Sequence, residues 1–207
     1  MKKISWLGLI WVTTALFTFA RPAQGAFVVG AQVHPLNFFI LPSGTGLSTN
    51  GKFGTGAVFA GVSASTYFDL QAYLSSDNTG TFHGTGTLFG STGTFDGKFK
   101  VLSYGVEMKL APPAFPLYFK LGAGLCDLTS DVTYTVAGVP AGNPFGTFEA
   151  SFEGHFGLGF AFKLSAIRIH AGLDSVLVKL KSNAQTTAAG VSAFVYFRPN
   201  VGLSLFL

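Results

Sequence analysis

Ionisable side chains stand at alternate positions in two neighbouring stretches, and their chemistry has to be explained first. Glu149, Glu153 and His155 lie in the first stretch, and Arg168, His170 and Asp174 lie in the second. A histidine beside a serine and an acid would suggest nucleophilic catalysis. Neither His155-Phe156-Gly157 nor His170-Ala171-Gly172 supplies a nearby serine, so the sequence predicts no enzyme.

Metal binding is the second chemistry that histidines suggest, and the chain has His34, His83, His155 and His170. If Lys163 pairs with Arg168 across a tight turn, His155 faces Val176, six residues from His170. At about 3.3 Å per strand residue the two rings are roughly 20 Å apart, too far to share a metal ion. The pairs Gly122-x-Gly124 and Gly157-x-Gly159 have no following helix, so they do not predict a nucleotide site. We therefore expect no metal and no cofactor.

Polar and apolar side chains alternate along the chain, which is the pattern of a two-faced β-strand. From Phe148 to Phe162 the even positions are apolar or glycine, and the odd positions hold Glu149, Glu153 and His155. From Val191 to Leu207 the odd positions are all apolar. The same reading predicts strands over 26–37, 53–64, 67–76, 97–111, 116–129, 146–164, 166–181 and 188–207.

The composition indicates where the apolar faces point. Hydrophobic residues make up 48% of the chain and charged residues only 11%, against about a quarter charged in an ordinary domain. Beyond Gly25 no apolar run is long enough for a membrane-spanning helix. Long loops alternate with tight turns, as in barrels threaded through an outer membrane. The sequence predicts an all-β fold, an eight-stranded antiparallel up-and-down transmembrane β-barrel over 26–207, with excess strand length beyond the outer surface.

Pro199 interrupts the last predicted strand. It lies on the apolar face and removes one backbone donor, which predicts a local bulge or bend. A rival reading makes Arg198-Pro199-Asn200 a turn and gives nine strands, but it would break the even strand count.

The first 25 residues are typical of a secretory signal peptide. Lys2 and Lys3 precede an uncharged apolar run, and Ala23-Gln24-Gly25 offers small residues for cleavage. Removing Lys2, Lys3 and Arg21 from the 13 basic residues leaves 10 against 9 acidic ones, so no nucleic-acid partner is expected. The single cysteine, Cys126, excludes an internal disulfide framework.

The chain ends on alternating apolar residues. Asn200-x-Gly202-x-x-Leu205-x-Leu207 resembles the C-terminal assembly signal of bacterial outer-membrane barrels, which the barrel-assembly machinery reads. The chain departs from the commonest form by ending in Leu207 with Phe206 before it. With the signal peptide and the eight strands, nearly all of 26–207 resembles in architecture the small outer-membrane barrels such as the transmembrane domain of outer membrane protein A and its stand-alone relatives.

This resemblance carries expectations about place and partners. It implies the outer membrane of a Gram-negative bacterium, contact with outer-membrane lipid and lipopolysaccharide, and contact with the assembly machinery during biogenesis. The family has no shared catalytic residues that could be assigned here.

The polar face of each strand is expected to line the interior, because lipid solvates charged groups poorly. If Leu110 faces Leu117, Glu107 falls opposite Lys120, which predicts an interior ion pair. The predicted interior network is Glu107, Lys120, Glu149, Glu153, His155, Arg168, His170 and Asp174. An eight-stranded barrel is only wide enough for such side chains to fill it.

The predicted loop from 77 to 96 carries TGTF, TGTL and TGTF. It could be a surface-displayed binding loop with Phe82, Phe89 and Phe95 as contact residues. The alternative is a flexible or extended hairpin without a ligand.

The sequence therefore favours a structural or surface-interaction protein with a filled polar lumen. Two alternatives stay open, a narrow channel for small solutes or ions and an outer-membrane enzyme that modifies lipid A. A third possibility is a soluble ligand-binding barrel whose apolar face points inward.

Overall fold

The computed structural model describes most of the chain beyond residue 25. The described residues are 26–35, 38–40, 48–50, 55–65, 68–78, 81–88, 90–111, 116–142, 149–182 and 192–207. The predicted signal peptide, residues 1–25, lies outside them.

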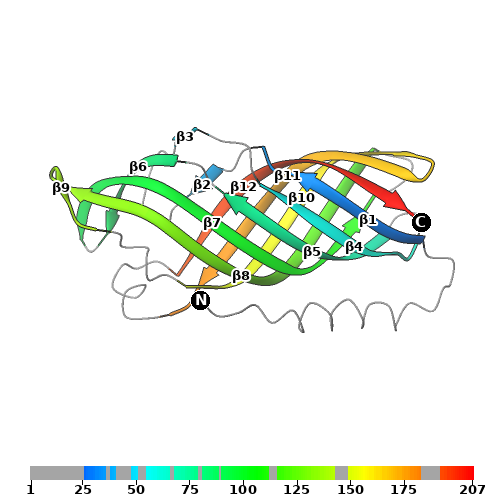
Figure 1. The fold of residues 1–207 in the computed structure, drawn as a ribbon, viewed down its shortest axis with the longest axis horizontal. Coiled ribbons are helices and arrows are strands. Elements are labelled where there is room, and N and C mark those ends of the chain that lie inside the picture. The colour runs from blue at the N-terminus through cyan, green and yellow to red at the C-terminus, as the bar shows by residue number, and fades with distance from the viewer. Residues whose placement is uncertain are drawn as a thin grey trace.

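Eight antiparallel strands close a barrel, in the order β1, β4, β5, β7, β8, β10, β11, β12 and back to β1. Their bounds are β1 Ala26–Val33, β4 Gly56–Ser63, β5 Phe68–Asn78, β7 Ser91–Leu110, β8 Leu117–Val136, β10 Ala150–Leu164, β11 Ile167–Leu180 and β12 Ala193–Phe206. Each strand pairs with its sequence neighbour among the eight, and β12 closes onto β1 (Figure 1). The predicted fold class is confirmed.

Four short strands flank the barrel: β2 Phe38–Ile40, β3 Ser48–Asn50, β6 Thr81–Leu88 and β9 Val139–Pro140. β6 pairs with the first part of β7, and β9 pairs with the last residues of β8. β7 and β8 have 20 residues each, about twice what a tilted transmembrane strand needs. They project far beyond the other strands at one end of the barrel (Figure 1).

This projection, which we call the extension, comprises β6, β9, residues 91–98 of β7 and residues 129–136 of β8. Most of the segments 77–96 and 130–145, which the sequence analysis treated as loops, are strand here. Alternating threonines and apolar residues pair well across strands, and Thr85↔Thr94 and Phe95↔Tyr134 are such pairs. β7 and β8 thus continue as paired sheet past the ends of the other barrel strands. The position of this sheet beyond the outer membrane surface stays a prediction.

The seam between β1 and β12 joins the two ends of the described barrel. Val28 pairs with Phe206, and Val33 pairs with Val201. The Phe27 N–H donates to the Leu207 carbonyl at 3.1 Å, and the Leu207 N–H donates to the Phe27 carbonyl at 2.8 Å. β12 is therefore paired on both sides down to its last residues.

Pro199 causes neither a bulge nor a turn. β12 runs through it, and the register with β11 is unbroken from Ile167↔Leu205 to Lys179↔Ala193, with Leu173 opposite Pro199. On the other side β1 pairs only as far as Val201, and β2 begins pairing at Phe197. Pro199 lies in that interruption, where a missing N–H costs no ladder bond.

The barrel has an apolar outer face and a buried inner face that alternate along each strand. Large exposed apolar side chains include Val106, Met108, Leu110, Phe119, Leu121, Phe156, Leu158, Phe160, Ile169, Leu173, Leu203 and Leu205. Charged inward side chains are 0–5% exposed, among them Arg198 and Glu107. Hydrocarbon outside and ion pairing inside explain this inverted arrangement. In the described part of the chain, no helix has the length and apolar character to cross a membrane.

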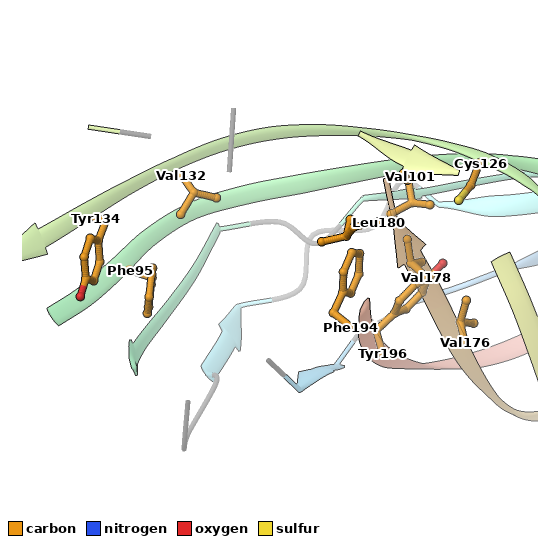
Figure 2. Packing of buried hydrophobic residues seen from close by; sticks show 11 residues of the cluster. Phe95, Val101, Cys126, Val132, Tyr134, Val176, Val178, Leu180, Phe194 and Tyr196 are labelled. Atoms are coloured by element: carbon orange, nitrogen blue, oxygen red, sulfur yellow. The ribbon is translucent and has the colours of Figure 1, made fainter. Parts of the chain in front are cut away.

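The interior has two tiers. The half nearer the short turns holds the ionic side chains beside a small apolar cluster of Val28, Phe59, Tyr73 and Phe206. The half nearer the extension is a larger apolar cluster: Phe95, Val101, Cys126, Val132, Tyr134, Ala150, Val176, Val178, Leu180, Phe194 and Tyr196. Figure 2 shows Phe194 and Tyr196 beside Leu180 and Val178 in the barrel, and Phe95 facing Tyr134 on the extension. The Phe95 and Tyr134 rings stack at 4.7 Å between centroids.

Candidate functional site: the barrel interior

Arg198 lies at the boundary between the two tiers and contacts acids from three other strands. Its Nη1 donates to Asp77 Oδ2 at 2.7 Å and to Ser75 Oγ at 3.2 Å, and its Nε donates to Asp174 Oδ2 at 3.1 Å. Its Nη2 lies 3.7 Å from Glu153 Oε1. The planar guanidinium has five donors in a fixed fork, so one side chain ties β12 to β5, β10 and β11.

Lys120 extends this network toward the short-turn end. Its Nζ donates to Asp174 Oδ2 at 2.8 Å and lies 3.8 Å from Glu107 Oε2. The second oxygen of Asp174 accepts from Asn200 Nδ2 at 3.0 Å, and the Tyr118 hydroxyl donates to Asn200 Oδ1 at 3.0 Å. Asp174 is therefore compensated by two cations and one amide.

His155 bridges two carboxylates. Its Nδ1 lies 3.1 Å from Glu153 Oε1, and its Nε2 lies 3.2 Å from Glu107 Oε2. The ring of Tyr73 meets the imidazole edge to face, with centroids 5.1 Å apart, and the Tyr73 hydroxyl is 3.4 Å from Glu153 Oε1. Glu107 comes from β7, so the histidine on β10 reaches across β8.

Two further groups complete the network. His34 Nδ1 lies 2.5 Å from Asp77 Oδ1, and its Nε2 lies 2.7 Å from Gln32 Nε2. The Tyr196 hydroxyl donates to Asp77 Oδ2 at 2.8 Å. Asp77 thus has partners on both oxygens, and Tyr196 links the ionic tier to the apolar one.

The short-turn end is closed by cations against aromatic rings. Arg168 forms an ion pair with Asp69. Its Cζ lies 4.6 Å from the Phe206 ring centroid, and Lys163 Nζ lies 4.1 Å from the same centroid. Lys109 Nζ lies 4.3 Å from the centroid of Tyr118. Cation–π attraction strengthens when water is excluded.

Inward glycines make room for the large polar side chains. A Cβ on Gly122 would lie 2.3 Å from the His155 ring, and one on Gly202 would lie 2.5 Å from His170. A Cβ on Gly157 would lie 2.2 Å from Asp174 Oδ1, and one on Gly172 would lie 2.3 Å from the Tyr118 hydroxyl. The glycines thus form part of the site, because a narrow barrel can hold these side chains only over bare backbone.

Seven of the eight residues predicted for the interior network lie there. Glu107, Lys120, Glu153, His155, Arg168, His170 and Asp174 are 0–5% exposed. The register prediction behind the metal argument is also confirmed, because Lys163 pairs with Arg168 and His155 with Val176. In the described part of the chain no group of three or more His, Cys, Asp or Glu side chains is placed to hold a metal ion.

Glu149 is the exception, and its predicted interior position is wrong. The register of β10 against β11 shifts between Ala150 and Phe152, so Ser151 is an extra residue in a β-bulge. The bulge turns Ala150 inward and leaves Glu149 exposed. Lys181 Nζ donates to Glu149 Oε2 at 2.8 Å, and this bond raises the pKa of Lys181.

The predicted register of the β7–β8 hairpin is wrong by two residues. Leu110 pairs with Phe119, Lys109 lies opposite Lys120, and Glu107 lies opposite Gly122. A two-residue shift preserves which side chains face inward. Lys120 reaches Glu107 diagonally, with its Nζ 3.8 Å from Glu107 Oε2, so the predicted interior ion pair is present although the two residues are not directly opposite each other.

The predicted assembly signal divides between the two faces of β12. Asn200 is buried in the network and Gly202 lies against His170, while Leu205 and Leu207 are exposed on the apolar face. Recognition by the assembly machinery stays a prediction.

The predicted surface contacts are not borne out at Phe95, which is 1% exposed and packed on Tyr134. The strand begins before residue 97, and its alternation of inward and outward side chains places this ring on the inward face. Phe89 and the side chain of Phe82 lie outside the described residues.

Several interior residues were not among those predicted from the sequence, above all Arg198 and Asp77. Asp69, Lys109, Tyr118 and Tyr196 belong to the same group. All six lie on the inward parity of their strands. Applying the alternation rule to every position of every predicted strand would have found all of them except Asp77, which lies one residue beyond the predicted strand 67–76.

Together, the closed antiparallel barrel, the apolar outer face and the ionic interior define a transmembrane β-barrel of the kind found in bacterial outer membranes. The short-turn end is the periplasmic end of such a barrel, and the extension lies on the outer side.

Comparison with known proteins yields likenesses of fold only. No family model matches the chain, and no curated protein matches it in sequence. Neisserial surface protein A matches with a TM-score of 0.45 and 13% identity over 88% of this chain and 99% of that chain. The outer membrane protein OprG from Pseudomonas aeruginosa matches with a TM-score of 0.35 and 11% identity over 88% and 95%. The translocator domain of the autotransporter NalP from Neisseria meningitidis gives 0.34 and 10% over 96% and 94%.

Proposed function

We propose that this protein is a closed outer-membrane barrel with a structural or surface-interaction role, and that it is neither a channel nor an enzyme. The observation that supports this is the filled interior. Arg198, Asp174 and Glu153 meet near the barrel axis with 0–1% exposure. A solute would have to break several buried ion pairs to pass them.

The apolar tier gives a second barrier on the outer side. Val176, Val178 and Tyr196 are fully buried, and Phe194 and Leu180 are 4% exposed. An ion passing this layer would lose its hydration without gaining polar partners, which is costly. Two successive barriers of opposite chemistry therefore argue against the narrow-channel alternative.

The extension is the feature that supports a surface role. Its inner face packs Phe95, Val132 and Tyr134, whereas its outer face exposes Asp96, Lys98, Asp131 and Thr133. This polar face lies on the same side of β7 and β8 as their apolar outer face, but farther along the strands, beyond the membrane. We propose that outer-membrane lipid, including lipopolysaccharide, contacts the apolar band, and that the extension presents the polar face above it.

Planar-bilayer recording tests the closed interior. Refolded barrel, residues 26–207, is added to membranes that conduct normally when a porin is added. We expect no discrete current steps across a range of voltages. Anomalous migration of the unheated protein on a gel confirms that the barrel is folded. Reproducible unitary openings from such protein would contradict the proposal.

A further inference from the structure

His155 has a carboxylate oxygen facing each of its ring nitrogens, Glu153 Oε1 at 3.1 Å and Glu107 Oε2 at 3.2 Å. An ionised carboxylate only accepts hydrogen bonds, and a neutral imidazole donates from one nitrogen and accepts at the other. A neutral ring would therefore turn a bare nitrogen toward a carboxylate oxygen. We infer that His155 is held as the doubly protonated imidazolium and acts as a proton-dependent clasp that joins β10 to β7 inside the barrel.

Among the residues whose side chains the structure describes, two other histidines are buried, and they show the contacts of a neutral ring in this interior. His34 must donate from Nδ1 to Asp77, and its Nε2 faces the donor nitrogen of the Gln32 amide, so Nε2 accepts. His170 donates from Nε2 to Gln32 Oε1 at 3.4 Å, and its Nδ1 has no partner. One orientation of Gln32 serves both rings, each with a single proton. His155 differs because both of its neighbours are acceptors.

The charge of the sealed interior points to the same state. The buried carboxylates among the described residues are Asp69, Asp77, Glu107, Glu153 and Asp174, and the buried lysines and arginines are Lys109, Lys120, Arg168 and Arg198. Five acids against four bases leave one uncompensated negative charge. A net charge in a water-poor enclosure is unfavourable, and a proton on His155 removes it.

The groups around His155 determine what deprotonation would do. Glu107 from β7 and Glu153 from β10 flank the ring, Tyr73 from β5 meets its edge, and Gly122 from β8 lies beneath it. The remaining cations are farther from these acids, with Lys120 from β8 3.8 Å from Glu107 and Arg198 from β12 3.7 Å from Glu153. Asp174 from β11 is occupied by the same two cations. Loss of the proton therefore leaves one carboxylate facing a bare nitrogen, and the nearest other donor is the Tyr73 hydroxyl, 3.4 Å from Glu153 Oε1.

The consequence is a stability that depends on pH. An unfolded histidine loses its proton near pH 6.5. At any pH at which His155 is neutral in the unfolded chain but charged in the folded barrel, folding takes up a proton. The stability of the barrel therefore falls as pH rises through this range. The clasp is closed at lower pH and opens when His155 finally deprotonates in the barrel.

Nitrogen NMR of the refolded barrel with ¹⁵N-labelled histidine tests the protonation state directly. At pH 7.5 we expect one ring with both nitrogens protonated, and its signal should be absent from His155→Gln. We also expect a neutral ring protonated at Nδ1 that is lost in His34→Gln, and one protonated at Nε2 that is lost in His170→Gln. A neutral His155 at this pH overturns the inference.

A charge-matched pair of variants tests the cause. Glu107→Gln removes one buried carboxylate, so the remaining interior charges balance without His155, and we expect the imidazolium signal to be lost at pH 7.5. Glu149→Gln makes the same change at an exposed site and should leave the signal intact. If both variants keep it, or both lose it, the charge argument is wrong. These measurements need only a folded barrel, so they are independent of the conductance test of the proposed function.

Thermal unfolding provides the functional readout. The temperature at which the folded gel band disappears should fall between pH 6 and pH 9 for the wild type. His170→Gln should keep this fall, because its ring is neutral throughout, whereas His155→Gln should flatten it. Parallel profiles for wild type and His155→Gln would contradict the clasp. If His155→Gln does not refold, the wild-type spectrum and the Glu107→Gln comparison still decide.

Discussion

Arg198 contacts Asp77 on β5, Glu153 on β10 and Asp174 on β11, so it joins the first half of the chain to the β10–β11 hairpin. Buried ion pairs add little net stability over an apolar core, but a buried charge without its partner is costly. The ion pairs of Arg198 therefore add little net stability, but removing Arg198 leaves three buried carboxylates without this partner, which is costly.

The first prediction follows from this asymmetry. Arg198→Met keeps an unbranched apolar stem and removes the charged guanidinium, and we expect it to lower the free energy of unfolding by about 3–5 kcal/mol. Lys181→Met is the matched control, because Lys181 pairs with Glu149 at the exposed rim, where solvent screens the pair. Urea unfolding from lipid vesicles measures both. Equal effects of the two substitutions would show that burial of the network is unimportant.

At the scale of single strands, the bulge in β10 decides which side chains enter the barrel. Ala150 pairs with Leu180 and Phe152 pairs with Lys179, so Ser151 has no place in the register. Its hydroxyl donates to the Lys179 carbonyl at 3.3 Å at an exposed position. The residue is thus an insertion that the sheet accommodates, and not a part of the alternation.

Deleting Ser151 should therefore be tolerated. The shortened strand keeps Ala150 inward and Phe152 outward, and the loss of one exposed hydrogen bond costs about 1 kcal/mol. Deleting Leu158 from the regular part of β10 should abolish folding, because it moves every inward side chain on one side of the deletion to the lipid face. Heat-modifiable gel migration after refolding compares the two deletions. A folded Leu158 deletion would show that register in this strand is loosely specified.

The same elements show how far the sequence could predict the structure. Alternation locates the eight strands and their inward faces, because lipid outside and ions inside give each face a distinct composition. Alternation cannot reveal a single inserted residue such as Ser151. In Glu149-Ala150-Ser151 the residue types do not decide which side chains face inward, because alanine and serine fit either face. Nor can alternation fix the register of β7 on β8, because a two-residue shift changes no side chain's face. Arg198 could have been placed inside, but its three partners depend on side-chain reach across the barrel.

For the whole molecule, the interior accounts for the unusual composition. Part of the glycine content has this cause, since a narrow closed barrel can hold a few large ionic side chains only where glycines such as Gly122, Gly157, Gly172 and Gly202 present bare backbone. The apolar tier then continues into the extension, so the extension and the barrel share one apolar cluster. Because both tiers are filled with packed side chains, the lumen is a core of the protein and not an open channel.

The closure of β1 on β12 leads to the last prediction. These strands pair from Val28↔Phe206 to Val33↔Val201, so barrel closure depends on backbone pairing and not on which covalent connection joins neighbouring strands. A circular permutant can link Leu207 to Ala26 through a short flexible linker, with its new first residue at Ala166 and its new last residue at Ser165. This design opens a two-residue exposed turn, which lies at the same short-turn end of the barrel. We expect it to refold into the same barrel, because termini that lie side by side and exposed turns tolerate such rearrangement. Heat-modifiable migration and the β-sheet circular-dichroism spectrum measure the outcome. A permutant opened within β11, between His170 and Ala171, is the control that should fail, because it cuts a strand paired on both sides; if the Ser165 permutant fails equally, closure requires the native chain order.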